Sequence, residues 1–130
     1  MAATSFPLLT PLADIEIVDT AVTNTAVANA SGSSGTVTLY YVEIDNTANT
    51  ATSYLKMVRA ASATPSSTSP DTIMSVPGST KQYFAFGTGL TQTYLTYWAT
   101  STAANGATQT APTTAITARF LLRNSVTPPP

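Results

Sequence analysis

The stretch Ser53–Leu90 decides the fold and reads SYLKMVRAASATPSSTSPDTIMSVPGSTKQYFAFGTGL. It contains three short runs, each bounded by turn residues, which predict strands: Tyr54–Arg59, Thr72–Val76 and Lys81–Phe86. The run Ser62–Pro70 between the first two is polar and contains proline, so we expect an exposed loop. Pro77-Gly78 is typical of a turn and predicts a hairpin between the second and third runs. The stretch therefore indicates an all-β chain.

Comparable runs flank this stretch on both sides. Ile15 and Ile17 share one face of Asp14–Val18 by strict alternation, which is the pattern of a half-buried strand. The other flanking runs that predict strands are Val22–Ala28, which is weaker, Thr36–Asp45, which has the strongest β-propensity, Thr91–Ser101 and Thr114–Arg123. Together with the central stretch they give about eight short strands.

Turn residues suggest how these strands connect. Asn46–Ala51 suits a turn, so we expect Thr36–Asp45 to pair with the returning run Ser53–Ala60. Gly87-Thr88-Gly89 predicts the end of the strand that begins at Lys81.

Alternation also predicts which side chains share a face. In Thr36–Asp45, one face should carry Val37, Leu39 and Tyr41, and the other Tyr40, Val42 and Ile44. Later in the chain, Leu95, Tyr97 and Ala99 should share one face, as should Ile116, Ala118, Phe120 and Leu122. Both faces of Thr36–Asp45 are apolar in the middle, which predicts a central strand.

These strands predict a single β-sandwich of the jelly-roll or immunoglobulin-like type. Residues 14–124 would form this domain. Residues 1–13 are apolar but interrupted by proline, and we interpret them as an extended arm. Residues 125–130 form a Pro-rich tail that cannot extend a sheet. The order of the strands stays open.

The composition limits the classes of function. Charged residues make up only 8% of the chain, against about 25% in an ordinary soluble domain. So weak a charge favours a protein packed against other subunits, with an ordinary Thr-rich β-domain as the alternative. The net charge of −1 argues against nucleic-acid binding. We expect no membrane span and no secretion signal, because the apolar runs are short and no basic segment opens the chain.

Catalytic chemistry has little support in the sequence. The chain has no His and no Cys, which excludes Ser-His-Asp and Cys-His arrangements and zinc-thiolate sites. The pairs Asp14/Glu16 and Glu43/Asp45 each share a strand face, and we interpret them as solvated faces in preference to a glycosidase pair or calcium ligands. We therefore expect no enzyme, no catalytic residue, no metal and no cofactor.

Two sets of side chains leave alternatives open. The aromatic residues could form a sugar-stacking platform, although their position inside strands favours core packing: Tyr40, Tyr41, Tyr83, Tyr94, Tyr97 and Trp98. The basic residues Lys56, Arg59, Arg119 and Arg123 could pair with a neighbouring subunit or simply provide solubility.

Turns and strand ends across residues 36–123 resemble those of small tailed-bacteriophage virion proteins. The matching pieces are Asn46–Ala48, Tyr54-Leu55-Lys56, Ser75-Val76-Pro77-Gly78, Phe84-Ala85-Phe86-Gly87, Gly89-Leu90 and Thr114–Leu122. The chain departs from the pattern where Ser62–Pro70 lacks a glycine and where Ala99–Gln109 lacks an Asp. Residues 1–20 have no counterpart in the pattern.

The resemblance implies a non-enzymatic virion structural protein, foremost a capsid decoration (cement) protein. Such a protein would be assembled in the host cytoplasm, lie on the outer head surface and bridge major capsid subunits. Its partners would be the major capsid protein and other copies of itself, as a dimer or trimer. Expected partner-binding residues are Phe6, Pro7, Leu8, Leu9, Pro11, Leu12, Arg119 and Arg123. The alternatives are a glycan-binding tail or receptor-binding component and a cell-surface carbohydrate-binding module.

Overall fold

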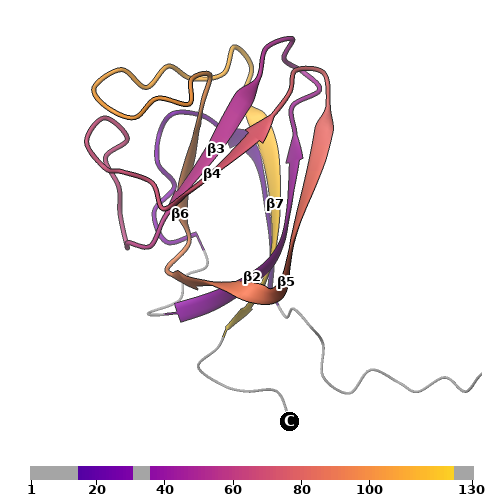
Figure 1. The fold of residues 1–130 in the computed structure, drawn as a ribbon, viewed down its shortest axis with the longest axis vertical. Coiled ribbons are helices and arrows are strands. Elements are labelled where there is room, and N and C mark those ends of the chain that lie inside the picture. Colours follow the sequence, from indigo (N-terminus) through magenta and orange to yellow (C-terminus); the bar gives the residue numbers. More distant parts are fainter. Residues whose placement is uncertain (1–14, 31–35, 125–130) are drawn as a thin grey trace, which may run out of the picture.

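The computed structural model describes residues 15–30 and 36–124, which form two antiparallel sheets. The strands of this part of the chain are β1 (Ile15–Val22), β2 (Thr36–Asp45), β3 (Ser53–Val58), β4 (Thr72–Val76), β5 (Lys81–Thr93), β6 (Thr96–Thr100) and β7 (Ile116–Asn124). One sheet has the order β1-β7-β2-β5 and the other β4-β3-β6 (Figure 1). The described residues contain no helix, so the predicted all-β class is confirmed.

The segment 23–30 takes the place of an eighth strand along the free edge of β6. Val27 forms a bridge with Tyr97, and hydrogen bonds join Ala99 N to Thr23 O and Ala30 N to Leu95 O, at 2.8 and 2.7 Å. When this irregular segment is counted as a strand, the two sheets have the strand order of a jelly roll. The expected strand at Val22–Ala28 is therefore present as an interrupted edge, with Val22 itself in β1.

The sequence predicted two hairpins around Ser53–Leu90, one between β2 and β3 and one between β4 and β5, and both predictions are wrong. β3 does not pair with β2 but with β4 and β6, and β5 pairs with β2 and not with β4. The turns at Asn46–Ala51 and Pro77-Gly78 instead carry the chain from one sheet to the other. Local turn chemistry is the same for a hairpin and for a crossing between sheets, so the sequence could not distinguish them.

A β-bulge at Tyr40 changes the faces of β2. The register with both neighbouring strands shifts between Leu39 and Tyr41. Val37 and Leu39 therefore share the buried face with Val42 and Ile44, and Tyr41 points the other way. The expected grouping of Tyr41 with Val37 and Leu39 is wrong because one extra residue reverses the alternation.

The glycines at Gly87 and Gly89 do not end β5, which continues to Thr93. The chain turns instead at Tyr94, whose φ of +61° lies in the left-handed region. β6 then begins at Thr96. Thus the predicted break lies several residues too early.

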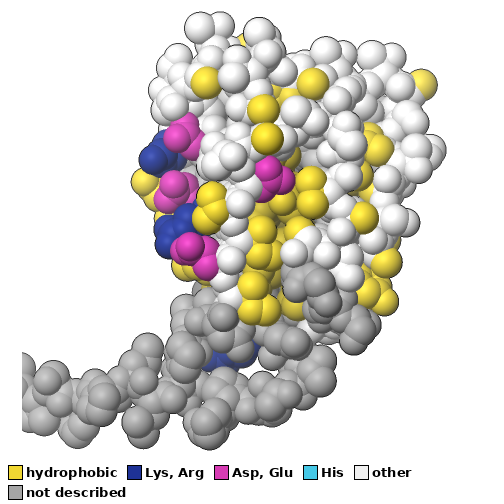
Figure 2. Space-filling view, turned by 180° about the vertical axis from the view of Figure 1, so that it is seen from behind, with side chains coloured by type: hydrophobic (Ala, Val, Ile, Leu, Met, Phe, Trp, Pro, Cys, Tyr) yellow, Lys and Arg dark blue, Asp and Glu magenta, His cyan; other side chains and the backbone are white. Residues whose placement is uncertain are grey.

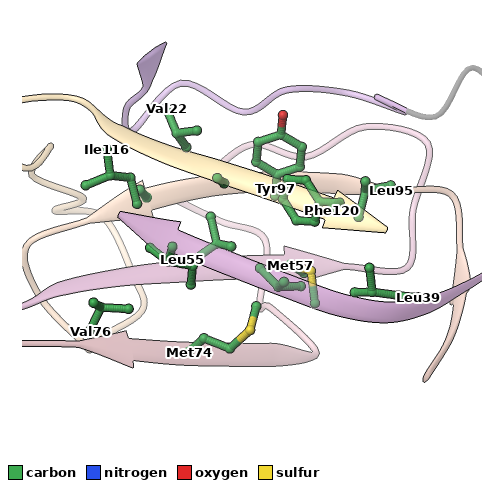
Figure 3. Close-up of a cluster of buried hydrophobic side chains, with 14 of the residues drawn as sticks. Val22, Leu39, Leu55, Met57, Met74, Val76, Leu95, Tyr97, Ile116 and Phe120 are labelled. Atoms are coloured by element: carbon green, nitrogen blue, oxygen red, sulfur yellow. The ribbon is translucent and has the colours of Figure 1, made fainter. Parts of the chain in front are cut away.

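A single hydrophobic core lies between the two sheets (Figure 3). Side chains from both sheets meet there, and the rings of Tyr97 on β6 and Phe120 on β7 are 4.7 Å apart. The predicted grouping of side chains on shared faces is confirmed, because all of these residues of β6, β7 and the position before β6 belong to the core: Leu95, Tyr97, Ala99, Ile116, Ala118, Phe120 and Leu122. Burial of one such large side chain contributes about 1.5–3 kcal/mol.

A buried polar cluster holds the crossing loops together at one end of the sandwich. Asn46 Nδ2 donates to the carbonyl oxygens of Val76 and Pro77, and Asn46 Oδ1 accepts from Asn49 and Ser53. Asn49 Nδ2 in turn donates to the Thr114 carbonyl at 2.9 Å. The side chains of Asn46 and Asn49 thus join the loop after β2 to the loop after β4 and to the loop before β7. These hydrogen bonds hold the connections between the two sheets in place.

Candidate functional site

Charged side chains gather on the outer face of the four-stranded sheet, by which we mean the outward-pointing side chains of β1, β7, β2 and β5. The chain has five basic and six acidic residues. Three of each occupy outward positions on this sheet: Lys81, Arg119 and Arg123, and Glu16, Glu43 and Asp45. Figure 2 shows acidic and basic side chains following one another down one side of the molecule, with hydrophobic side chains beside them. The surface of an otherwise weakly charged protein therefore has one distinctive face.

Neighbouring strands pair these charges across the sheet. Arg119 on β7 donates from Nε to Glu16 Oε2 on β1 at 2.8 Å. Lys81 Nζ on β5 lies 3.7 Å from Glu43 Oε1 and 3.9 Å from Asp45 Oδ2, both on β2. Exposed ion pairs contribute at most about 1 kcal/mol each to stability. Stability alone therefore does not account for the concentration of charge on this face.

The electrostatics of the face shift two acidic groups in opposite directions. Hydrogen bonds from the Thr47 hydroxyl and backbone amide hold the pKa of Asp45 below its usual value, and Lys81 adds to this effect. Partial burial raises the pKa of the Tyr41 hydroxyl, and the nearby Glu43 carboxylate raises it further. At neutral pH the carboxylate of Asp45 is charged and Tyr41 is neutral.

Exposed apolar side chains lie among the charges. Among the described residues, the large hydrophobic side chains with most exposure are Val18 at 52%, Ile73 at 41% and Tyr83 at 58%. Val18 and Tyr83 both belong to the outer face, at its opposite edges on β1 and β5. Exposed apolar groups surrounded by polar and charged side chains are typical of protein-binding surfaces.

The structure places two of the predicted partner-binding residues on this face. Arg119 lies near its centre, and Arg123 lies four residues further along β7, with its guanidinium carbon 6.0 Å from the centre of the Tyr40 ring. The other predicted residues lie outside the described part of the chain: Phe6, Pro7, Leu8, Leu9, Pro11 and Leu12.

Sequence reasoning missed the partners of Arg119. The sequence indicated Glu16 and Glu43 only as members of solvated strand faces and Tyr83 only as one of the aromatic residues, and it did not single out Val18. Alternation in Asp14–Val18 gave the correct outward position of Glu16. The strand order that brings four strands side by side was the missing information.

Two of the aromatic residues considered for a sugar-binding platform are part of the interior of the fold. Tyr97 and Trp98 are buried at 1% and 0% exposure, so neither can serve a sugar-stacking platform. Tyr97 donates its hydroxyl to Asp19 Oδ2 at 2.8 Å, and burial raises its pKa. No group of three or more His, Cys, Asp or Glu side chains that could hold a metal ion occurs within the described ranges. Nor does the described part of the chain include a helix able to cross a membrane.

The interpretation of Lys56 as a surface group is wrong. Its side chain is fully buried, and Nζ donates to Ala104 O at 2.7 Å and to Gln109 Oε1 at 2.9 Å. Burial lowers the pKa of its ammonium group. Lys56 thus holds the loop between β6 and β7 against the outer side of β3.

Comparison with protein-family models, with curated proteins and with solved structures found no match.

Proposed function

We propose that this chain is a non-enzymatic structural protein of a bacteriophage particle, a decoration (cement) protein that binds the outer head surface and bridges major capsid subunits. The observation that carries the proposal is the outer face of the four-stranded sheet. This face combines exposed Val18 and Tyr83 with cross-strand ion pairs on a protein whose remaining surface carries little charge. Such a face suits association with protein.

Two further features support the proposal. The sequence motifs between residues 36 and 123 resemble those of small virion proteins of tailed phages. Jelly rolls also occur in viral capsid proteins, although they occur in lectins and other proteins too, so the fold contributes only an analogy. Association repeated over a shell gains in avidity from many contacts of modest strength.

The proposal assigns different contacts to different parts of the chain. The arm expected at residues 1–13 could extend about 40 Å and reach an adjacent capsid subunit. Phe6, Leu8, Leu9 and Leu12 would supply its apolar contacts. The outer face, with Arg119 and Arg123, would supply the second contact surface, toward another copy of the chain in the same assembly.

Immunogold electron microscopy on intact particles tests the proposal. Antibody against the purified chain should label the outside of the head. A second preparation, made with a chain lacking residues 1–13, should retain the circular-dichroism spectrum of the folded sandwich but no longer label heads. Particles that carry no label on any part would contradict the proposal.

The alternative of a glycan-binding tail component is favoured by one observation. Tyr83 is exposed, and its ring centre lies 5.9 Å from that of Tyr41 at an angle of 39°. Label on the tail, together with glycan-array binding that Tyr83→Ala abolishes, would favour this alternative. Label on the host cell envelope would favour a cell-surface carbohydrate-binding module.

A further inference from the structure

Four residues, one from each strand, form a continuous row across the middle of the outer face. Val18 on β1 is in register with Arg119 on β7, Arg119 with Glu43 on β2, and Glu43 with Tyr83 on β5. We call these four residues the central row. Its two ends are exposed apolar side chains, and its two middle positions carry opposite charges.

The central row is complementary to itself under a two-fold rotation. Consider an axis that lies in the interface, parallel to the strands, between β7 and β2. Rotation about it exchanges the outer strands with each other and the inner strands with each other. A second copy would then place Val18 opposite Tyr83 and Arg119 opposite Glu43, each contact occurring twice.

The remaining charges on the four strands follow the same pattern. Across the order β1-β7-β2-β5 the strands carry Glu16, Arg119, the pair Glu43 and Asp45, and Lys81. The charge of the strands is therefore negative, positive, negative and positive in this order. The same rotation sets each acidic strand against a basic strand of the second copy, but only Arg119 and Glu43 come directly opposite each other. Glu16 comes opposite Ala85 and Asp45 opposite Thr117, so Glu16 and Lys81 contribute only longer-range attraction.

We infer that the outer face binds a second copy of this chain, so that two sandwiches pack face to face through their four-stranded sheets as a two-fold dimer. Sheets packed in this way lie about 10 Å apart with strands within about 30° of each other, which retains the facing of the central rows. The inference deepens the proposed function and rests on it only for the role of this face in assembly.

The size of the face is compatible with such a dimer. Four strands at about 4.8 Å spacing and about eight residues of strand length cover a projected area of about 500 Å². The accessible area of a corrugated surface is larger than its projection. Each partner in a specific interface buries about 600–1,000 Å², so the face reaches the lower part of this range.

Sedimentation equilibrium with charge-reversed variants tests the inference. The full chain should sediment with twice its monomer mass of 13.5 kDa at micromolar concentration. Arg119→Glu would place two acidic rows face to face, and Glu43→Arg two basic rows. Either variant alone should therefore weaken the dimer by about a hundredfold or more.

Mixing the two variants gives the decisive arm of the experiment. In a heterodimer of Arg119→Glu with Glu43→Arg, both central contacts again join opposite charges, so the mixture should recover the dimer mass. Arg59→Glu reverses a charge at an exposed residue away from this sheet and serves as the control that should not change the association. Circular dichroism confirms that each variant is folded.

Three results would overturn the inference. The full chain could sediment as a monomer or as an odd-numbered oligomer; the single reversals could leave the dimer unchanged; or the mixture could fail to recover it. None of these bears on where the protein lies on a particle. Immunogold labelling of heads by a monomeric chain would leave the proposed function standing while excluding the dimer.

Discussion

Two buried polar side chains show how individual residues fix the fold. Lys56 has the least expected environment, because a Lys side chain is seldom fully buried. Its ammonium group binds the Ala104 carbonyl and the Gln109 side chain, so it is paired with neutral oxygens and not with a carboxylate. Desolvation is therefore the dominant influence on its pKa, which falls below the ordinary value of 10.5.

The lowered pKa gives stability a specific pH dependence. Between the folded-state pKa of Lys56 and 10.5, the unfolded chain binds more protons than the folded chain, so stability rises with pH through this window. Lys56→Met lacks this group. Urea unfolding of both proteins from about pH 7 to about pH 10 should show a shift in favour of the wild type as pH rises. A difference that is constant or shifts the other way would contradict the assignment of a buried, charged lysine.

Asn46 offers a second prediction at this scale. Its side chain uses both amide hydrogens and both acceptor positions inside the polar cluster, so Asn46→Ala leaves buried carbonyl and hydroxyl groups unpaired. We expect a loss of about 3 kcal/mol in the free energy of unfolding. Asn105→Ala, in an exposed loop, should change it by less than about 0.5 kcal/mol. Equal effects of the two substitutions in urea unfolding would show that the cluster does not hold the loops.

At the scale of elements, two glycines show that a glycine can be required at one position and dispensable at another. A Cβ on Gly78 would lie 2.1 Å from the carbonyl oxygen of Thr50, because the two crossing loops touch at this point. A Cβ on Gly87, within β5, would meet nothing within 4 Å. The glycine between β4 and β5 is required by a close approach between loops, and the glycine in the strand is not.

Substitution of each glycine by alanine should separate these roles. Gly78→Ala forces the loops apart and should cost about 1–3 kcal/mol, measured as a lower midpoint in thermal or urea unfolding. Gly87→Ala should remain within about 1 kcal/mol of the wild type, since it removes only backbone flexibility. The account of the crossing loops would be wrong if Gly87→Ala were the more damaging change.

The elements also show how far the sequence could predict the fold. Alternation gave the sets of side chains that share a face in β6 and β7, and propensity and turn residues gave the boundaries of β4, because these depend only on neighbouring residues. The partners of β3 and β5 could not be predicted in the same way, since turns of one composition serve both hairpins and sheet crossings. The bulge at Tyr40 reversed one face of β2 without any local signal in a run of apolar residues.

At the scale of the whole molecule, the same limit applies to the candidate site. Arg119 and Arg123 could be proposed from the sequence as exposed basic residues of one strand. The meeting of Arg119 with Glu16 and Glu43 depends on the order β1-β7-β2, which brings residues far apart in the chain side by side. The alternation of charge across the sheet, which points to a second copy as partner, becomes visible only once the strands are assembled.

Cysteine cross-linking tests the face-to-face arrangement most directly, because the chain has no cysteine of its own. The two-fold axis sets Val18 of one copy against Tyr83 of the other and separates identical residues to opposite edges. Facing sheets lie about 10 Å apart, which is too far for a direct disulfide, so a short bis-maleimide reagent joins the two thiols. A mixture of Val18→Cys and Tyr83→Cys chains treated with this reagent should therefore form a covalently linked dimer on a denaturing gel, whereas either variant alone, or Ile73→Cys on the other sheet, should remain monomeric. A mixture that gives no more linked dimer than Ile73→Cys alone would contradict the central claim that this sheet face joins two copies.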